Sequence, residues 1–201
     1  MVQYKLLEST YGYEGFFKLE VLRLQHELFA GGWSPPIIRE CLERGHAVAV
    51  LPYDPLRDEV VLIEQFRIGA LHTPSGPWLL EVVAGIIKPG EARLDVARRE
   101  TQEEIGCELL DSVPICEYLV SPGGTSENIA LYCGWIDASQ AGGIHGLAEE
   151  HEDIRAQVLP RQEALQLLRS GQIISATPLI ALQWLETHYL DLQTRWGQNA
   201  E

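Results

Sequence analysis

The stretch GIIKPGEARLDVARRETQEEIGC at residues 85–107 decides the fold. Its second half has the composition of a helix, which we predict over residues 94–105. Within that helix Glu100, Glu103 and Glu104 are spaced i, i+3 and i+4, so their side chains lie on one face a few ångströms apart. Like charges this close destabilise a helix unless positive charge joins them.

Two sources of positive charge fit this face. Arg99 lies i,i+4 from Glu103 and can neutralise it. Glu100 and Glu104 stay available for a divalent cation, and their hard oxygen ligands suit Mg²⁺ or Mn²⁺. The simplest alternative is a solvated acidic helix, because most runs of charge form one. The glycines at both ends of the preceding loop favour the metal site, since few loops need glycine at each end and a glutamate directly after.

The other face of the predicted helix is apolar. It carries Leu94, Ala97, Thr101 and Ile105, which we expect to be buried. Gly106 follows directly and is expected to end the helix as its C-cap.

Outward from this helix, strand and helix patterns alternate in an order that predicts an α/β fold with a mixed sheet. Strands are expected at residues 16–24, 25–30, 47–53, 59–66, 78–83, 115–120, 129–136 and 154–159, and helices at 161–169 and 178–194. The loop over residues 138–151 has a length that is often functional. We expect an N-terminal β segment over residues 1–45, too small to be stable alone, and a main domain over 46–201.

The charge balance restricts the partners of the protein. Its 201 residues carry 15 Lys and Arg against 29 Asp and Glu, a net charge of −14. Nucleic acids and anionic membranes are bound mainly through Lys and Arg, so we expect neither as a partner. A small phosphate compound remains possible where metal ions mediate the contact.

Cysteine usage and the N-terminal sequence point to a reducing compartment. The 4 cysteines form no CxxC pair and no zinc-finger spacing, so we expect reduced thiols. The first residues show no basic region followed by an apolar run, and no stretch has the roughly 20 apolar residues of a membrane helix. We expect a cytoplasmic protein.

Residues 85–107 resemble the Nudix box, which reads G, five residues, E, seven residues and R-E-U-x-E-E-x-G-U, where U is aliphatic. Every fixed position matches, and these are Gly85, Glu91, Arg99, Glu100, Glu103, Glu104 and Gly106. Thr101 and Cys107 stand where a larger aliphatic residue is usual, and both are small enough to be buried. The chain is thereby identified as similar to the Nudix hydrolases, whose fold is an α/β/α sandwich with a mixed sheet.

The resemblance extends to the ADP-ribose pyrophosphatase subgroup of that family. Pro122 stands fifteen residues past the box, at the position that marks this subgroup. Further similar segments are GFF at 15–17, ERGHA at 43–47, PYDPLRDEVVLIEQFRIGA at 52–70, SPGGTSE at 121–127, EDIR at 152–155 and IALQWL at 180–185. This resemblance implies Mg²⁺-dependent hydrolysis of ADP-ribose to AMP and ribose 5-phosphate.

Two alternatives to that activity stay open. The first is hydrolysis of another nucleoside diphosphate sugar such as GDP-mannose. The second is a sensor that binds ADP-ribose without cutting it. Sensors of this kind usually lose box carboxylates and carry a DNA-binding appendage, whereas this chain keeps the carboxylates and shows no basic helix-turn-helix pattern.

The resemblance also implies roles in catalysis. The Mg²⁺ ligands are the backbone carbonyl of Ala84 and the carboxylates of Glu100, Glu104 and Glu152. Arg99 and Glu103 orient these ligands. The general base is Glu150, in the loop at 138–151, which closes over bound substrate in the family. Glu149 is an alternative base because a slip of one residue is easy in a loop, and His151 is another on pKa grounds.

The remaining implications concern the substrate and the assembly. Substrate contacts are expected from Phe16, Phe17, Arg39, Arg67, Ser121 and Glu127. The arginines would grip phosphates or ribose, and the two phenylalanines would stack on adenine. Surface ion pairs for the arginines and a core position for Phe17 are the alternatives. A homodimer is expected, in which residues 1–45 are exchanged between subunits.

Overall fold

The computed structural model describes residues 2–197 and divides the chain into two compact units. The first unit contains the chain up to His46 together with Tyr118–Asn128. The second contains Ala47–Glu117 and the chain from Ile129 onward. A segment distant in sequence therefore joins the N-terminal residues in one unit.

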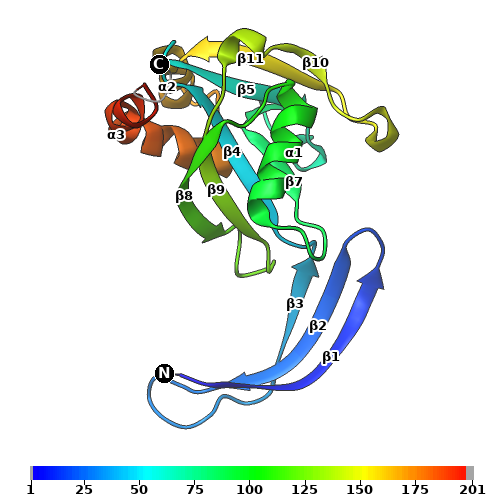
Figure 1. Ribbon diagram of the computed structural model, residues 1–201. Helices are drawn as coiled ribbons and strands as arrows, with labels where there is room; N and C mark the ends of the chain where they lie inside the picture. The colour runs from blue at the N-terminus through cyan, green and yellow to red at the C-terminus, as the bar shows by residue number, and fades with distance from the viewer. Residues whose placement is uncertain (1, 198–201) are drawn as a thin grey trace. The chain divides into compact units, whose positions relative to one another are not determined.

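The first unit is built on an antiparallel sheet of β1 (Tyr4–Glu14), β2 (Lys18–His26) and β3 (Ile37–Glu43), drawn in blue in Figure 1. The sequence predicts two strands at 16–24 and 25–30, but a single strand, β2, covers most of this stretch. Strand β1 is not indicated by the sequence pattern. Its residues are exposed along the whole strand, so the alternation of buried and exposed positions that indicates a strand is absent there.

The segment from the other part of the chain is tied to β3 by backbone and side-chain bonds. The Leu42 N–H donates to the Gly124 carbonyl at 2.8 Å, and the Thr125 hydroxyl donates to the Leu42 carbonyl at 2.9 Å. These bonds satisfy polar groups of the last strand of the small sheet.

The second unit contains an eight-stranded mixed sheet in the order β10-β11-β5-β4-β9-β8, with β6 beside β5 and β7 beside β4. Its strands are β4 (Ala47–Asp54), β5 (Glu59–Phe66), β6 (Trp78–Glu81), β7 (Val83–Ile86), β8 (Asp111–Leu119), β9 (Asn128–Trp135), β10 (Gly143–His145) and β11 (Ile154–Pro160). Its helical elements are η1 (Ile68–Ala70), α1 (Arg93–Ile105), η2 (Ala138–Gln140), η3 (Ala148–Glu150), α2 (Arg161–Arg169) and α3 (Ala176–Gly197). Strands β4 and β9 are parallel.

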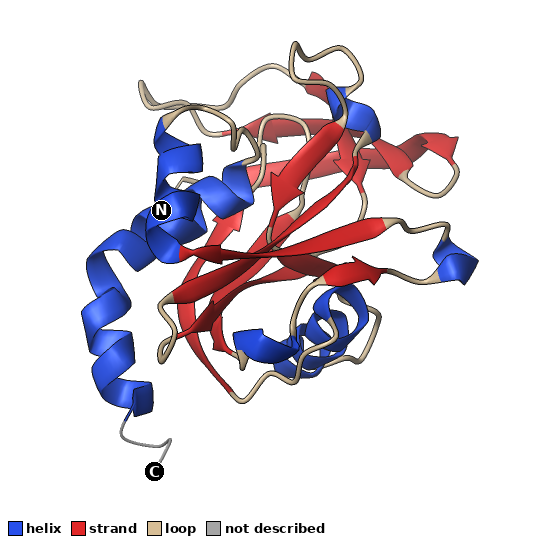
Figure 2. Cartoon of the chain, turned by 90° about the horizontal axis from the view of Figure 1, so that it is seen from above, coloured by secondary structure: helices blue, strands red, loops and turns tan. Residues whose placement is uncertain are grey.

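Helices cover both faces of this sheet. Figure 2 shows the strands between α1 on one side and the pair α2 and α3 on the other, which is the α/β/α sandwich that the resemblance implies. Strand β4 is buried at every position because helices lie on both of its sides. The core on the α1 side includes Val48, Val50, Val61 and Ile63, so the alternating residues between them face α2 and α3.

An ion pair fastens α2 to the turn between β4 and β5. The buried guanidinium of Arg161 donates to both carboxylate oxygens of Asp58, at 2.7 and 2.9 Å. The Tyr53 hydroxyl also donates to Asp58 at 2.8 Å. A bidentate pair of this kind fixes orientation as well as distance.

Helix α1 forms where predicted, and Gly106 ends it with a φ of 72°, in the left-handed region that favours glycine. Thr101 and Ile105 are buried as expected. The prediction for Leu94 is wrong, since 39% of its surface is exposed. The buried side of the helix instead includes Val96 and Glu104. The buried face is therefore rotated about the helix axis relative to the face that the apolar pattern predicts.

The strand predicted at 78–83 is two strands. Residues 78–81 form β6 and pair with β5, and residues 83–86 form β7 and pair with β4. Strands β4 and β5 pair with each other only at Tyr53–Val60 and Asp54–Glu59, next to their turn. Beyond these residues the two strands separate, and β7 and β6 occupy the edges that this leaves free. The crossing at Val82 brings β7 beside α1.

Two further expectations concern the whole chain. All 4 cysteines have free thiols, and Cys107 and Cys133 are buried. No helix within the described residues is long and apolar enough to cross a bilayer.

Candidate active site

The centre of the candidate site is the carboxylate of Glu104, on the buried side of α1. Only 3% of this residue is exposed. Its Oε2 accepts a hydrogen bond from the Ala84 N–H of β7 at 3.1 Å. Burial raises the pKa of Glu104 well above its usual value, and the nearby charges of Glu100 and Glu152 raise it further. A carboxylate this deep requires a cationic partner to be ionised at neutral pH.

Glu100 lies one turn earlier and packs against the β7 backbone. Burial raises its pKa to about 7, against the opposing charge of Arg99. A Cβ added at Gly85 would lie 1.8 Å from the Glu100 Oε1, so any side chain there would displace the carboxylate. The glycine that opens the box therefore leaves room for the Glu100 carboxylate to approach the strand.

Arg99 is the shared partner of the acidic residues around this pair. Its Nη1 donates to Glu103 at 3.0 Å, as the i,i+4 spacing predicts, and lies 2.8 Å from Glu100 Oε1. Its Nη2 lies 3.8 Å from Glu91, which also accepts the Lys88 N–H at 2.8 Å. Glu91 was not among the predicted site residues, although its fixed position in the box was a signal for it.

The loop after β10 holds Glu152 near enough to Glu100 and Glu104 for its charge to contribute to the raised pKa of both. Glu152 Oε2 accepts the Leu147 N–H at 3.1 Å, and the Glu152 N–H donates to the Leu147 carbonyl at 3.2 Å. The three predicted carboxylate ligands therefore lie in one neighbourhood, without standing at ligand spacing.

The predicted base, Glu150, is the last residue of η3, but its side chain lies outside the described part of the structure. Its alternatives Glu149 and His151 are exposed. The assignment of the base to Glu150 stays a prediction.

The donor set fits a hard divalent cation. Carboxylates of Glu100, Glu104 and Glu152 supply oxygen ligands and an excess of buried negative charge, which a cation would compensate. Among the described residues, no three His, Cys, Asp or Glu side chains already stand at ligand spacing. Instead, one carboxylate oxygen of Glu104 and one of Glu152 each accept a hydrogen bond from a backbone N–H.

Arg67, a predicted substrate contact, lies near this cluster. Its positive charge partly offsets the raised pKa of Glu104. Its Nε donates to Glu81 at 2.7 Å, and the Ser175 hydroxyl donates to the same carboxylate at 3.0 Å. In this structure Arg67 therefore forms an ion pair, which is the alternative to a substrate contact that the sequence left open. Its partner, Glu81, was not predicted.

Two predicted substrate residues of the first unit are joined by an arginine that was not predicted. Arg44 lies over the Phe17 ring, 5.1 Å from its centroid, and pairs with the buried Glu127 at 3.4 Å. The Phe16 ring is 87% exposed and contacts Phe17 edge to face. Of the two phenylalanines, Phe16 is therefore the one whose ring is largely exposed to solvent.

Arg39 and Ser121 also belong to the first unit. The Arg39 guanidinium donates to the neighbouring Ile38 carbonyl at 2.8 Å. The Ser121 carbonyl accepts the N–H groups of Gly124 and Thr125, both at 3.0 Å, and so closes the turn of this segment. These contacts are local to the unit.

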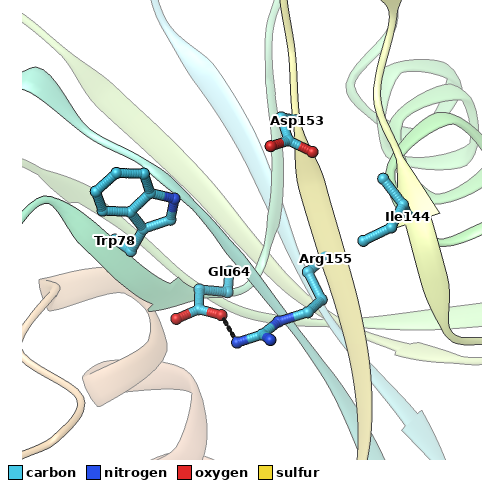
Figure 3. Close-up of a pocket in the computed structure, with 5 residues that line it drawn as sticks. All are labelled: Glu64, Trp78, Ile144, Asp153 and Arg155. Atoms are coloured by element: carbon cyan, nitrogen blue, oxygen red, sulfur yellow. Dashed lines mark hydrogen bonds and ion pairs between the residues drawn. The ribbon is translucent and has the colours of Figure 1, made fainter.

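A pocket of about 350 Å³ on the second unit is lined by Glu64, Trp78, Ile144, Asp153 and Arg155 (Figure 3). Glu64 and Arg155 point toward one another and form an ion pair. Ile63 and Ile154, which directly precede them in the chain, belong to the core on the α1 side. Because successive side chains of a strand point to opposite faces, Glu64 and Arg155 lie on the other face of the sheet. The pocket therefore contains none of the clustered carboxylates.

Comparison with known proteins gives one family and several relatives. Residues 43–178 match the family described as NUDIX domain. The chain is 52% identical to the ADP-ribose pyrophosphatase of Escherichia coli (strain K12) over 185 residues, which are 92% of this chain and 88% of that protein. It is 46% identical to the ADP-ribose pyrophosphatase of Haemophilus influenzae over 190 residues, 93% of this chain and 88% of that protein.

The more distant matches include one relative found by sequence and one solved structure. The GDP-mannose pyrophosphatase of Salmonella typhimurium is 31% identical over 153 residues, 76% of this chain and 79% of that protein. A solved structure titled "Crystal structure of ADP compounds hydrolase" superposes with a TM-score of 0.72 at 21% identity, covering 96% of this chain and 97% of that chain. At that identity the superposition supports the fold alone.

Proposed function

The chain belongs to the NUDIX family of hydrolases, and from that premise we propose that it is an ADP-ribose diphosphatase. It hydrolyses the diphosphate linkage of ADP-ribose and releases AMP and ribose 5-phosphate. The observation that carries the proposal is the pair of buried carboxylates, Glu100 and Glu104, beside β7, whose raised pKa values the charge of Glu152 increases further, so that a cation would be favoured there. The high identity to two bacterial ADP-ribose pyrophosphatases supports this substrate.

The proposal includes a divalent metal, with Mg²⁺ as the natural ion and Mn²⁺ as a substitute. The residues that would hold it are the Ala84 carbonyl and the carboxylates of Glu100, Glu104 and Glu152. Bound there, a metal would supply Lewis acidity toward the diphosphate and would lower the pKa of the attacking water. Arg99 orients the ligands, since it already contacts Glu100 and Glu103.

The protein's part in the reaction is to position a water and remove its proton. The water oxygen forms a new bond to one phosphorus, the bond from that phosphorus to the bridging oxygen breaks, and the water's proton passes to a base. We assign the base to Glu150, because it lies in the same loop as Glu152, two residues away. Glu149 and His151 are the alternatives.

Substrate recognition is assigned to six residues, and those are Phe16, Phe17, Arg39, Arg67, Ser121 and Glu127. Support comes from the exposed ring of Phe16, which offers a face for adenine, and from the charge of Arg67 beside Glu104. Glu127 would act from a fixed place, because Arg44 holds its carboxylate.

The proposed assembly is a homodimer in which the N-terminal segment over residues 1–45 is exchanged, and residues 46–201 form the hydrolase domain. The support is the exposed length of β1 and the exposed rings of Phe16 and Phe29, since a small sheet cannot bury such surface alone. Light scattering at micromolar concentration tests it. A mass near 22.5 kDa, that of one chain, would refute the dimer.

The cytoplasm is the proposed location. The free thiols of all 4 cysteines, two of them only partly buried, favour a reducing compartment. The proposed partner is a small molecule, with no role for nucleic acid or membrane in view of the net charge of −14.

The test of the activity is a panel of nucleoside diphosphate compounds with Mg²⁺, compared by kcat/KM. GDP-mannose belongs in the panel because of the relative at 31% identity. We expect ADP-ribose to give the highest value. A tenfold advantage for GDP-mannose or for a dinucleoside polyphosphate would overturn the substrate assignment.

A further inference from the structure

The loop that carries Glu152 is attached to the C-terminal end of α1 by two neighbouring residues. The Gly146 N–H donates to the Glu103 carbonyl at 3.4 Å, one of the last carbonyls of the helix, which have no partner within it. The ring of His145 lies over the C-cap, where a Cβ at Gly106 would be 2.9 Å from His145 Cε1. We call Gly106, His145 and Gly146 the loop anchor.

The far side of the anchor is held by the sheet. His145 is the last residue of β10 and pairs with Ile154 of β11. Its Nε2 is hydrogen-bonded to the Gly142 carbonyl at 2.9 Å, so the ring has a fixed orientation on α1. The anchor thus connects the edge of the sheet to the end of the helix.

Beyond the anchor, the chain closes on itself. The two hydrogen bonds between Leu147 and Glu152 join the ends of a short loop. Gly146 and Glu152 lie side by side where this loop begins and ends, and we call this point the neck of the loop. A Cβ at Gly146 would lie 2.7 Å from the Glu152 Cβ, so only glycine fits at the neck. A displacement of the neck would therefore move Glu152 with it, because the closed loop has no slack at this point.

We propose that the loop anchor is a positioning element of the catalytic site, which sets where Glu152 stands relative to Glu100 and Glu104. The inference rests on the proposed function, since it concerns the rate of that reaction. None of the three anchor residues carries a carboxylate. Their effect is exerted through backbone position, and a misplacement of about 1 Å can cost on the order of a hundredfold in rate.

The structure offers a matched pair of variants. Gly106→Ala forces a Cβ against the His145 ring, at a φ of +72°. Gly171→Ala introduces the same methyl group at a φ of +74° after α2, where nothing lies within 4 Å. Both variants have the same backbone strain, and only the first disturbs the anchor. His145→Ala removes the ring, and the double variant of Gly106 and His145 removes the clash.

For the hydrolysis of ADP-ribose with saturating Mg²⁺, we expect Gly106→Ala and His145→Ala to lower kcat roughly 10- to 100-fold, with KM changed less than about threefold. Gly171→Ala should keep wild-type kcat. The double variant should be no slower than His145→Ala, because both changes act on one contact. The anchor is overturned if Gly106→Ala behaves like Gly171→Ala, or if the two losses multiply in the double variant.

A second measurement is independent of activity. Glutamyl endopeptidase cleaves after Glu149 and Glu150 in the closed loop, and we expect faster cleavage there in His145→Ala at an unchanged melting temperature. Equal cleavage rates would overturn the anchor even where Gly106→Ala fails to fold. A wild-type protein inactive on ADP-ribose would instead refute the proposed function, and the cleavage rates would still decide the anchor.

Discussion

Replacing Glu100 with glutamine should stabilise the metal-free protein at pH 8 and change little at pH 5. The usual pKa of this carboxyl is 4.5, and burial raises it to about 7 in the folded protein. An acid with a raised folded pKa binds more protons in the folded state than in the unfolded state between those two values. The free energy of unfolding therefore falls as pH rises from about 4.5 to about 7, and stays low above that.

The size of the effect follows from the two pKa values. Ionising Glu100 in the folded protein costs roughly 3 kcal/mol more than ionising it in the unfolded chain. Glutamine has no charge to bury, so it removes this cost. It also gives up the ion pair with Arg99, which is 2.8 Å away. We expect a net gain of about 1–3 kcal/mol at pH 8 in the free energy of unfolding.

Urea unfolding of both proteins in EDTA at pH 5 and pH 8 measures this gain. The matched control is Glu163→Gln, an exposed glutamate in the first turn of α2, where loss of the charge should instead cost under about 1 kcal/mol. With excess Mg²⁺ the order should reverse, because only the wild type keeps the full ligand set. A Glu100→Gln protein that is less stable than wild type in EDTA at pH 8 would refute the reasoning.

Three further changes probe other parts of the protein. Glu104→Gln should lower kcat by about a hundredfold or more, since a charge that holds the metal is lost, while circular dichroism shows an intact fold; a near-normal kcat would contradict the metal assignment. Glu150→Gln should lower kcat with little change in KM, and a larger loss in Glu149→Gln would move the base by one residue. Asp58→Asn should destabilise the protein by roughly 2–3 kcal/mol in thermal unfolding, because it leaves the buried Arg161 without its ion-pair partner. A variant as stable as the wild type would show that the ion pair contributes nothing to stability.

Local spacing made much of α1 predictable. The helix, its left-handed end at Gly106 and the pair of Arg99 with Glu103 all depend on residues within one or two turns of each other. Thr101 is buried as expected, and its hydroxyl donates to the Ala97 carbonyl at 2.7 Å, so the helix itself satisfies its polar group.

Contacts between distant segments were not predictable in the same way. Glu104 is drawn to the buried side by the N–H of Ala84, twenty residues earlier in the chain. The break at Val82 depends on which strand offers a free edge, and the local pattern of residues 78–83 gives no sign of it. The place of His145 on the end of α1 has no signal in the spacing of the sequence, because the two segments meet only in the folded protein.

The way β4 is paired has a consequence for the order of folding. Residues 47–50 pair with β7, residues 53–54 pair with β5, and residues 47–53 pair with β9, about eighty residues later. Until β9 is synthesised, one edge of the most buried strand has no neighbour. A nascent chain that stops before Asn128 therefore exposes an apolar edge to other chains, so folding of this unit is slow and prone to aggregation until that strand is added.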